Sequence, residues 1–152
     1  ININNINNEG ENAFFVADKK IMELLMSNGI DIHLINRNGE NALFKADLIE
    51  SIFLIEKGLN PNLINIYDEN AITHAEMDKT KFLLTKKEDL SLYTKEKMIE
   101  LNTEYPDTFS YEKIELINQR KKEIEILKEK EKISKDIKLD MNTFSEKVRK
   151  RI

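Results

Sequence analysis

The chain has 152 residues, of which 40% are apolar and 34% are charged, and its formal net charge is −4. This composition favours a folded, soluble chain over a disordered one, and the low numbers of Gly (4) and Pro (2) favour helices over a turn-rich β fold. The absence of cysteine excludes a disulfide framework, a thiol nucleophile and a cysteine-based zinc site, and no apolar run approaches the roughly 20 residues that span a bilayer. We expect a cytoplasmic protein without membrane contact.

A segment of 29 residues occurs three times in the N-terminal part of the chain. Residues 10–13 (Gly-Glu-Asn-Ala) return as residues 39–42 and, with Asp in place of Gly, as residues 68–71. Between residues 7–35 and 36–64, 12 of 29 positions are identical. A fixed period of this kind is typical of stacked repeats, because one short unit cannot bury its own apolar face.

Each 29-residue unit predicts a turn followed by two short helices, as the second unit shows. Gly39 supplies the positive φ that the turn needs. Asn41, like its counterparts in the other units, is placed to cap a short first helix over residues 41–46. A second helix is predicted over residues 49–57, and Gly58 ends it.

Residues 91–152 differ in composition and predict a helical C-terminal extension. A helix over residues 95–104 follows Thr94 as its N-cap, and a long helix is expected near residues 111–135. A capping box at residues 143–146 predicts a last short helix. The extension could cover the apolar end of the third unit, or its long helix could continue as a coiled-coil arm or a partner-binding helix.

The repeated unit resembles the ankyrin repeat, whose motif D-x-x-G-x-T-P-L-H-x-A precedes two antiparallel helices that end in L-L-x-x-G. Residues 36–46 (NRNGENALFKA) match the first part and residues 54–58 (LIEKG) the second, and the resemblance covers about residues 3–90. The chain departs from the family at Phe44, where ankyrin repeats have His, and in its period, which is shorter than the family's average of 33. The resemblance implies an all-α, helix-turn-helix repeat solenoid over residues 1–90, capped by C-terminal helices.

The resemblance also implies a partner-binding concave face, built from the turn tips and the short first helices. Arg37 and Tyr67 are the best candidate anchors, because aromatic residues and Arg dominate binding hot spots. The whole set of candidate partner-binding residues is Asn8, Glu9, Glu11, Val16, Arg37, Asn38, Glu40, Lys45, Ile66, Tyr67, Glu69 and His74. The alternative is that these are ordinary solvated residues and that the C-terminal helices bind the partner.

The charge of the repeats indicates what kind of partner to expect. Residues 1–89 contain 15 Asp and Glu against 9 Lys and Arg. This acidic balance favours a partner protein with a basic surface and gives no reason to expect nucleic acid. The basic cluster at Lys147, Arg149, Lys150 and Arg151 is interpreted as a solvated helix end.

No arrangement of residues predicts catalysis. His33 and His74 occupy non-equivalent positions and are interpreted as surface histidines, and the carboxylates recur with the repeat, as structural residues do. No Gly-rich phosphate loop and no metal-ligand spacing occur in the sequence. We therefore expect no enzymatic activity, no catalytic residues, no cofactor and no metal.

The Asn-, Ile- and Lys-rich composition and the short repeats resemble bacterial ankyrin proteins, some of which act as immunity proteins that bind and neutralise a toxin. An immunity protein is therefore the first functional hypothesis. The alternatives are an effector or adaptor that binds a host or cellular protein, and a targeting module of a larger enzyme. The chain opens on Ile1, inside a repeat, so we expect a fragment of a longer protein. The sequence does not indicate the oligomeric state.

Overall fold

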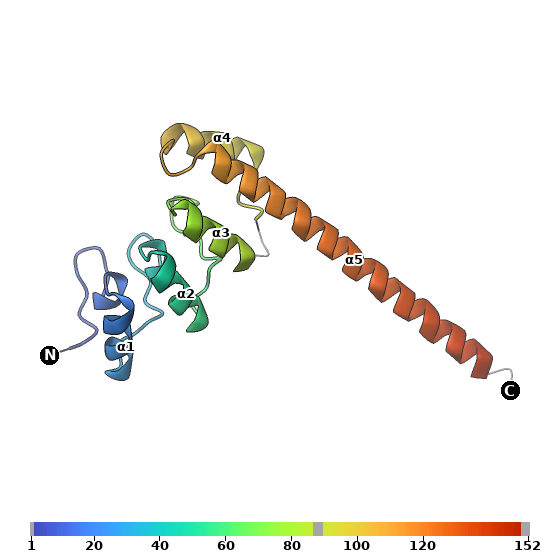
Figure 1. Cartoon of the computed structure of the whole chain (residues 1–152). Helices are drawn as coiled ribbons and strands as arrows, with labels where there is room; N and C mark the ends of the chain where they lie inside the picture. The colour runs from blue at the N-terminus through green and yellow to red at the C-terminus, as the bar shows by residue number, and fades with distance from the viewer. Residues whose placement is uncertain (1, 87–89, 150–152) are drawn as a thin grey trace. The chain divides into compact units, whose positions relative to one another are not determined.

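The structure is a computed structural model that describes residues 2–86 and 90–149, and these residues form an all-α fold without β-strands (Figure 1). The helices, with η for a 3-10 helix, are η1 (Ala13–Phe15), α1 (Lys19–Ser27), η2 (Ala42–Phe44), α2 (Leu48–Glu56), α3 (Met77–Lys86), α4 (Lys95–Glu104) and α5 (Tyr111–Arg149). The chain packs as two compact units, Ile1–Ile117 and Asn118–Ile152. None of the described helices is both long and apolar enough to cross a membrane.

The predicted asparagine caps are confirmed in all three 29-residue units. The side-chain oxygens of Asn12, Asn41 and Asn70 each accept a hydrogen bond from the backbone N–H two residues ahead, at 2.9–3.1 Å. The Nδ2 groups of Asn12 and Asn41 also donate to a carbonyl 19 residues further on, in the connector to the next unit. In the first two units the first helix is a single 3-10 turn, so η2 is shorter than the predicted span of residues 41–46. In the third unit, residues 71–74 form a turn rather than a helix.

The second helix of the unit agrees with the prediction within one residue. Asp18 and Asp47 precede α1 and α2, and their carboxylates accept hydrogen bonds from the first backbone N–H groups of the helices. Gly58 follows α2 with a φ of 90°, which a residue with a side chain adopts only under strain. These caps fix where each helix begins and ends, so the repeated sequence gives a repeated backbone.

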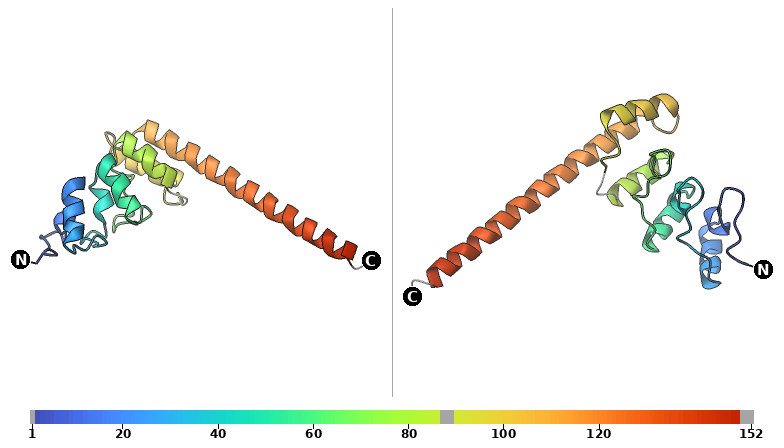
Figure 2. Two further views of the ribbon diagram at one scale, coloured as in Figure 1. Left: turned by 60° about the horizontal axis from the view of Figure 1, so that its bottom comes forward. Right: turned by 180° about the vertical axis from the view of Figure 1, so that it is seen from behind.

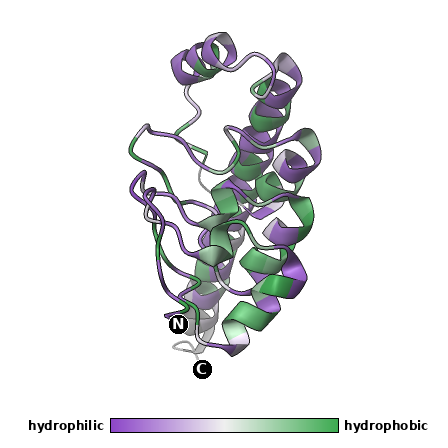
Figure 3. Ribbon diagram, turned by 90° about the vertical axis from the view of Figure 1, so that its left-hand side faces the viewer, coloured by the Kyte–Doolittle hydropathy of each residue, from purple (hydrophilic) through white to green (hydrophobic). Residues whose placement is uncertain are grey.

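Helices α1, α2 and α3 lie side by side, and the turns lie together on another side of the first compact unit (Figures 1 and 2). The colours of Figure 3 are hydrophilic along much of the turn side and are more hydrophobic along the helices. Phe14, Leu43 and Ile72 occupy equivalent positions, and all three are buried. Each of the three units therefore contributes an equivalent apolar side chain to the hydrophobic core.

The start of α5 belongs to the first compact unit. It contacts the third 29-residue unit in the same way as the start of α3 contacts the second unit. Lys79, the third residue of α3, donates from Nζ to the carbonyls of Leu43 (2.7 Å) and Ala46 (2.5 Å). Lys113, the third residue of α5, donates to the carbonyls of Ile72, Thr73 and Ala75, at 3.1, 3.3 and 2.5 Å. Leu43 and Ala46 lie one period before Ile72 and Ala75.

Helix α5 continues to Arg149 and is longer than the helix expected near residues 111–135. No Gly or Pro occurs between residues 135 and 143, so nothing local stops it. Thr143 does not cap a new helix, since its hydroxyl donates to the carbonyl of Leu139 inside α5 at 2.9 Å. Of the predicted basic cluster, the side chains of Lys147 and Arg149 and all of Lys150 and Arg151 lie outside the described part of the structure.

Candidate functional site

The turn tips are held by one asparagine in each unit. The Oδ1 atoms of Asn7, Asn36 and Asn65 each accept hydrogen bonds from the backbone N–H groups two and four residues ahead, at 2.9–3.0 Å. The fourth residue of each turn has a positive φ, and in the third unit it is Asp68, with a φ of 56°. Asp tolerates this conformation better than most residues, so the third turn keeps its shape without glycine.

Successive turns are joined through their backbones. The N–H of Arg37 donates to the carbonyl of Glu9, and the N–H of Ile66 donates to the carbonyl of Asn38, both at 2.9 Å. The two bonds are equivalent, because Ile66 and Asn38 each lie one period of 29 residues after Arg37 and Glu9. They set a fixed spacing between the exposed side chains at the tips.

Three of the four carboxylates predicted at the turn tips, Glu11, Glu40 and Glu69, point inward and form a chain of hydrogen bonds between units. Nδ2 of Asn36 donates to Glu11 in the unit before and to Glu40 in its own unit, both at 2.9 Å. Nδ2 of Asn65 repeats this with Glu40 at 3.1 Å and Glu69 at 3.2 Å. We call this chain of alternating Glu and Asn side chains the Asn–Glu ladder. Glu11 and Glu69 are buried within it and Glu40 is half-buried, so these carboxylates are poorly placed to meet a partner directly.

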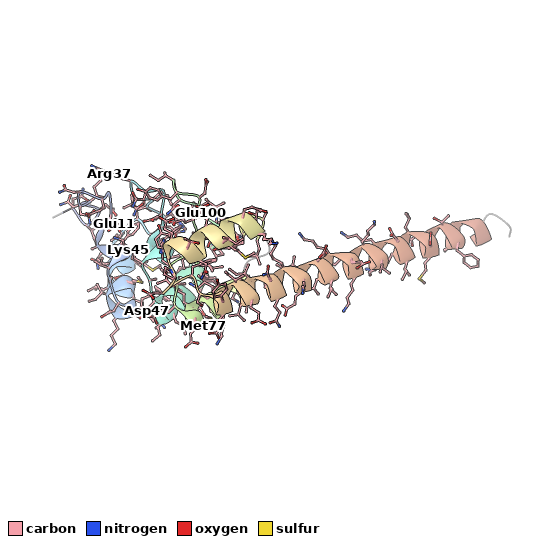
Figure 4. All side chains as sticks on the ribbon, turned by 90° about the horizontal axis from the view of Figure 1, so that it is seen from above. Glu11, Arg37, Lys45, Asp47, Met77 and Glu100 are labelled. Atoms are coloured by element: carbon pink, nitrogen blue, oxygen red, sulfur yellow. The ribbon has the colours of Figure 1, made fainter. Side chains whose placement is uncertain are left out.

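Both ends of the Asn–Glu ladder carry a basic side chain from the predicted first-helix row. Nζ of Lys45 lies 2.7 Å from Glu11, and Nε2 of His74 lies 3.2 Å from Glu69. Burial raises the pKa of the Glu11 carboxyl, but the hydrogen bonds from Lys45 and Asn36 and the charge of Lys45 outweigh burial and hold the pKa below its usual value. Figure 4 shows Arg37, Glu11, Lys45 and Asp47 following one another from the turn tips towards the start of α2.

The remaining predicted residues provide the exposed surface of the turn side. Ile66 and Tyr67 are 65% and 58% exposed, and Val16 is 78% exposed. Asn8, Glu9 and Arg37 are also exposed, and Asn38 is half-buried. The third turn thus presents two large exposed side chains, Ile66 and Tyr67, and the second turn presents Arg37. A surface of this kind suits protein binding, because large side chains held in place lose little entropy when a partner docks.

An open groove of about 510 Å³ is lined by residues of the second and third 29-residue units. Lys45 and His74, both predicted site residues, belong to its lining. Sequence reasoning did not assign its other charged residues, which are Asp47, Glu76, Asp78 and Lys79. The repeat pattern did not indicate a role for Lys79, because the equivalent residues one and two periods earlier are Glu50 and Ile21.

Sequence reasoning also missed a contact between the third unit and the segment after α4. The ring of Tyr105 meets the ring of His74 edge to face, with centroids 4.7 Å apart. His74 therefore lies between Glu69 and Tyr105, whereas His33 lies exposed in a connector. Within residues 2–86 and 90–149, no group of three or more His, Asp or Glu side chains is placed to hold a metal ion. No protein-family model matches the chain, and no curated protein matches it.

Proposed function

We propose that the chain is an ankyrin-like repeat module that binds another protein through its turn side, and that its role is binding rather than catalysis. The observation that carries the proposal is the row of exposed side chains at the second and third turns. Ile66 and Tyr67 are exposed at the third turn and Arg37 is exposed at the second, and a backbone hydrogen bond from Ile66 to Asn38 joins the two turns. A solenoid of stacked units, as the ankyrin resemblance implies, would present such a row along one face.

The partner that fits this face has an apolar pocket and an acidic group close to it. Ile66 and Tyr67 would fill the pocket, and Arg37 would pair with the acidic group. The net charge of −6 over residues 1–89 favours a partner whose surface is otherwise basic, through attraction at long range. The groove lined by Lys45 and His74 could receive a side chain or loop of the same partner.

Among possible partners, we favour a bacterial toxin that this chain neutralises as an immunity protein. The support is the resemblance of the repeats to bacterial ankyrin proteins, together with the acidic balance of residues 1–89, which suits a basic toxin. Co-expression with the toxin encoded by a neighbouring gene would test this: growth should be rescued by the wild type and not by the R37A/Y67A variant. Binding without rescue would instead favour an effector, an adaptor or the targeting module of a larger enzyme.

A photo-crosslinking experiment tests which face binds. A benzoylphenylalanine in place of Tyr67 should capture the partner, whereas the same group in place of Tyr111, which is exposed at the start of α5, should not. With the partner identified, we expect R37A/Y67A to weaken binding by roughly 10-fold or more. The matched control R120A/Y111A removes the same residue types from α5 and should leave the affinity unchanged. Weakening by the control alone would assign binding to the C-terminal helices.

A further inference from the structure

The surface with which the second 29-residue unit contacts the first has an uncovered counterpart on the first unit itself. Glu50 of α2 accepts a hydrogen bond from the backbone N–H of Lys19 at 3.2 Å, and the Nζ atom of Lys19 lies 5.6 Å from the centre of the Phe53 ring. Glu50 and Phe53 therefore lie on the side of α2 that contacts α1. One period earlier, the equivalent residues are Ile21 and Leu24 of α1.

The counterpart on the first unit is apolar and exposed. Leu24 is 59% exposed and Ile21 is 46% exposed, whereas Phe53 is 4% exposed. Ala13 of η1 is also exposed, although its counterparts in the second and third units are buried. A unit at the end of a repeat stack normally turns a polar outer face to the solvent. The apolar residues of the first unit are therefore typical of a unit that has a neighbour on this side.

The first unit also repeats two hydrogen-bond donors that join the later units to their neighbours. In the second and third units, the amide group of the ladder asparagine donates to the glutamate of the preceding unit, and the next backbone N–H donates to a carbonyl of the preceding turn. In the first unit, Nδ2 of Asn7 reaches only the glutamate of its own turn, at 3.5 Å. The N–H of Asn8 has no acceptor among residues 2–86 and 90–149. We call Asn7, Asn8, Ala13, Ile21 and Leu24 the open face.

We propose that the open face docks a further repeat unit of the same kind. That unit presents a glutamate to the amide of Asn7, a turn carbonyl to the N–H of Asn8, and an apolar surface to Leu24 and its neighbours. Continuity with the contact between the first and second units supports this occupant, because the equivalent positions make these contacts there. A second copy of the chain does not offer the matching surface, since Lys113 and the rest of residues 90–117 cover the other end of its repeats.

A chain lengthened by one unit tests the proposal. A second copy of residues 1–29, placed directly before Ile1, puts a glutamate and a turn carbonyl one period before Glu11 and Glu9. The first unit folds with its open face uncovered, so the added copy meets no new condition at its own open face. The lengthened chain should unfold in a single transition, with a midpoint at least about 4 °C above that of the natural chain, measured by circular dichroism. Two separate transitions, or no rise in the midpoint, overturn the proposal.

Substitutions made in both chains show whether the open face itself is covered. L24S, made at the original Leu24, should lower the midpoint only slightly in the natural chain, where this side chain is exposed, and by about 4 °C or more in the lengthened chain, where it is buried. V16S is the matched control and should have the same small effect in both chains, because Val16 and its counterparts Lys45 and His74 are all exposed. Equal effects of L24S in the two chains overturn the proposal. Self-association of the natural chain that L24S abolishes, measured by sedimentation velocity, would also overturn it, because the open face would then bind a second copy.

Discussion

At Asn36 a single side chain stabilises two units at once. Its oxygen accepts two backbone N–H groups of its own turn, and its amide group donates to Glu11 and Glu40. Only an amide side chain offers an acceptor and two donors at one place. Asparagine at this position therefore lets carboxylates of two neighbouring units share one side chain as their hydrogen-bond donor, and Asn65 repeats the arrangement one unit later.

Replacing Asn36 with Asp should destabilise the first compact unit strongly at pH 7. The variant keeps the acceptor for the turn but puts a third negative charge between Glu11 and Glu40. We expect a loss of about 2–3 kcal/mol in unfolding free energy, measured by urea unfolding monitored by circular dichroism. Because the neighbouring charges raise the pKa of the new carboxyl, the loss should shrink as the pH falls towards 4 and the group becomes neutral.

N7D is the matched control for this prediction. The Asn7 side chain is exposed, and its Nδ2 lies 3.5 Å from a single carboxylate, that of Glu11. The same substitution should therefore cost clearly less at this position. Equal losses in N7D and N36D would mean that the Asn–Glu ladder adds nothing beyond the turn itself.

The sequence predicts some of these asparagine roles and not others, for a physical reason. The caps at Asn12, Asn41 and Asn70 involve a backbone group two residues away, so local rules suffice. The bonds from Asn36 and Asn65 reach a carboxylate 25 residues earlier, and depend on how the units stack. The sequence does not show which side chains are exposed to solvent. For this reason the sequence predicts Glu11 and Glu69 on a binding face, although both side chains are buried.

At the scale of an element, the limits of prediction are clearest in α5. Its start near residue 111 was predicted, because Pro106 and Ser110 mark a boundary in the sequence. Its continuation beyond residue 135 was not, because the pattern at residues 143–146 is compatible with both a helix start and a helix interior. The contact between α5 and the third unit could not be predicted from the repeat either, because Lys113 follows Lys79 by 34 residues rather than by the period of 29.

Lys113 donates hydrogen bonds to three backbone carbonyls in the turn of the third unit, those of Ile72, Thr73 and Ala75. Burial and the charge of Lys79 lower the pKa of Lys113 to about 8, so its ammonium form predominates at pH 7. That form has three hydrogens for the three carbonyls within reach. We expect K113M to lower the unfolding free energy by about 2–4 kcal/mol, because three buried carbonyls lose this donor.

Hydrogen exchange distinguishes this loss from a general effect on α5. In K113M the amides of α3 and of residues 70–76 should exchange faster, whereas those of α1 should change little. K122M removes an exposed lysine two turns further along α5 and should alter neither exchange nor stability. Uniform acceleration throughout Ile1–Ile117 in K113M would show that Lys113 has no special connection with the third unit.

At the scale of the whole chain, composition and packing divide the molecule at different places. Composition changes near residue 90, whereas the first compact unit extends to Ile117. The reason is that residues 90–117 complete the core above the third unit. Tyr93, Leu101, Phe109 and Ile117 are fully buried, and the Tyr93 hydroxyl donates to Asn70 at 2.6 Å. This segment acts on the third unit as a further unit would, with a different sequence and length.

Two truncations separate these boundaries. A chain that ends at Arg120 keeps every residue of the first compact unit and should unfold at nearly the wild-type temperature. A chain that ends at Leu90 exposes Asn70 and the carbonyls that Lys113 covers, and its unfolding midpoint should fall by more than about 10 °C, since several kcal/mol are lost from a small unit. Both variants lack residues 121–152, so any effect of that part of α5 cancels between them. Circular dichroism at a chain concentration of a few micromolar makes the measurement, and equal midpoints for the two truncations would show that the repeats are stable without the segment that follows them.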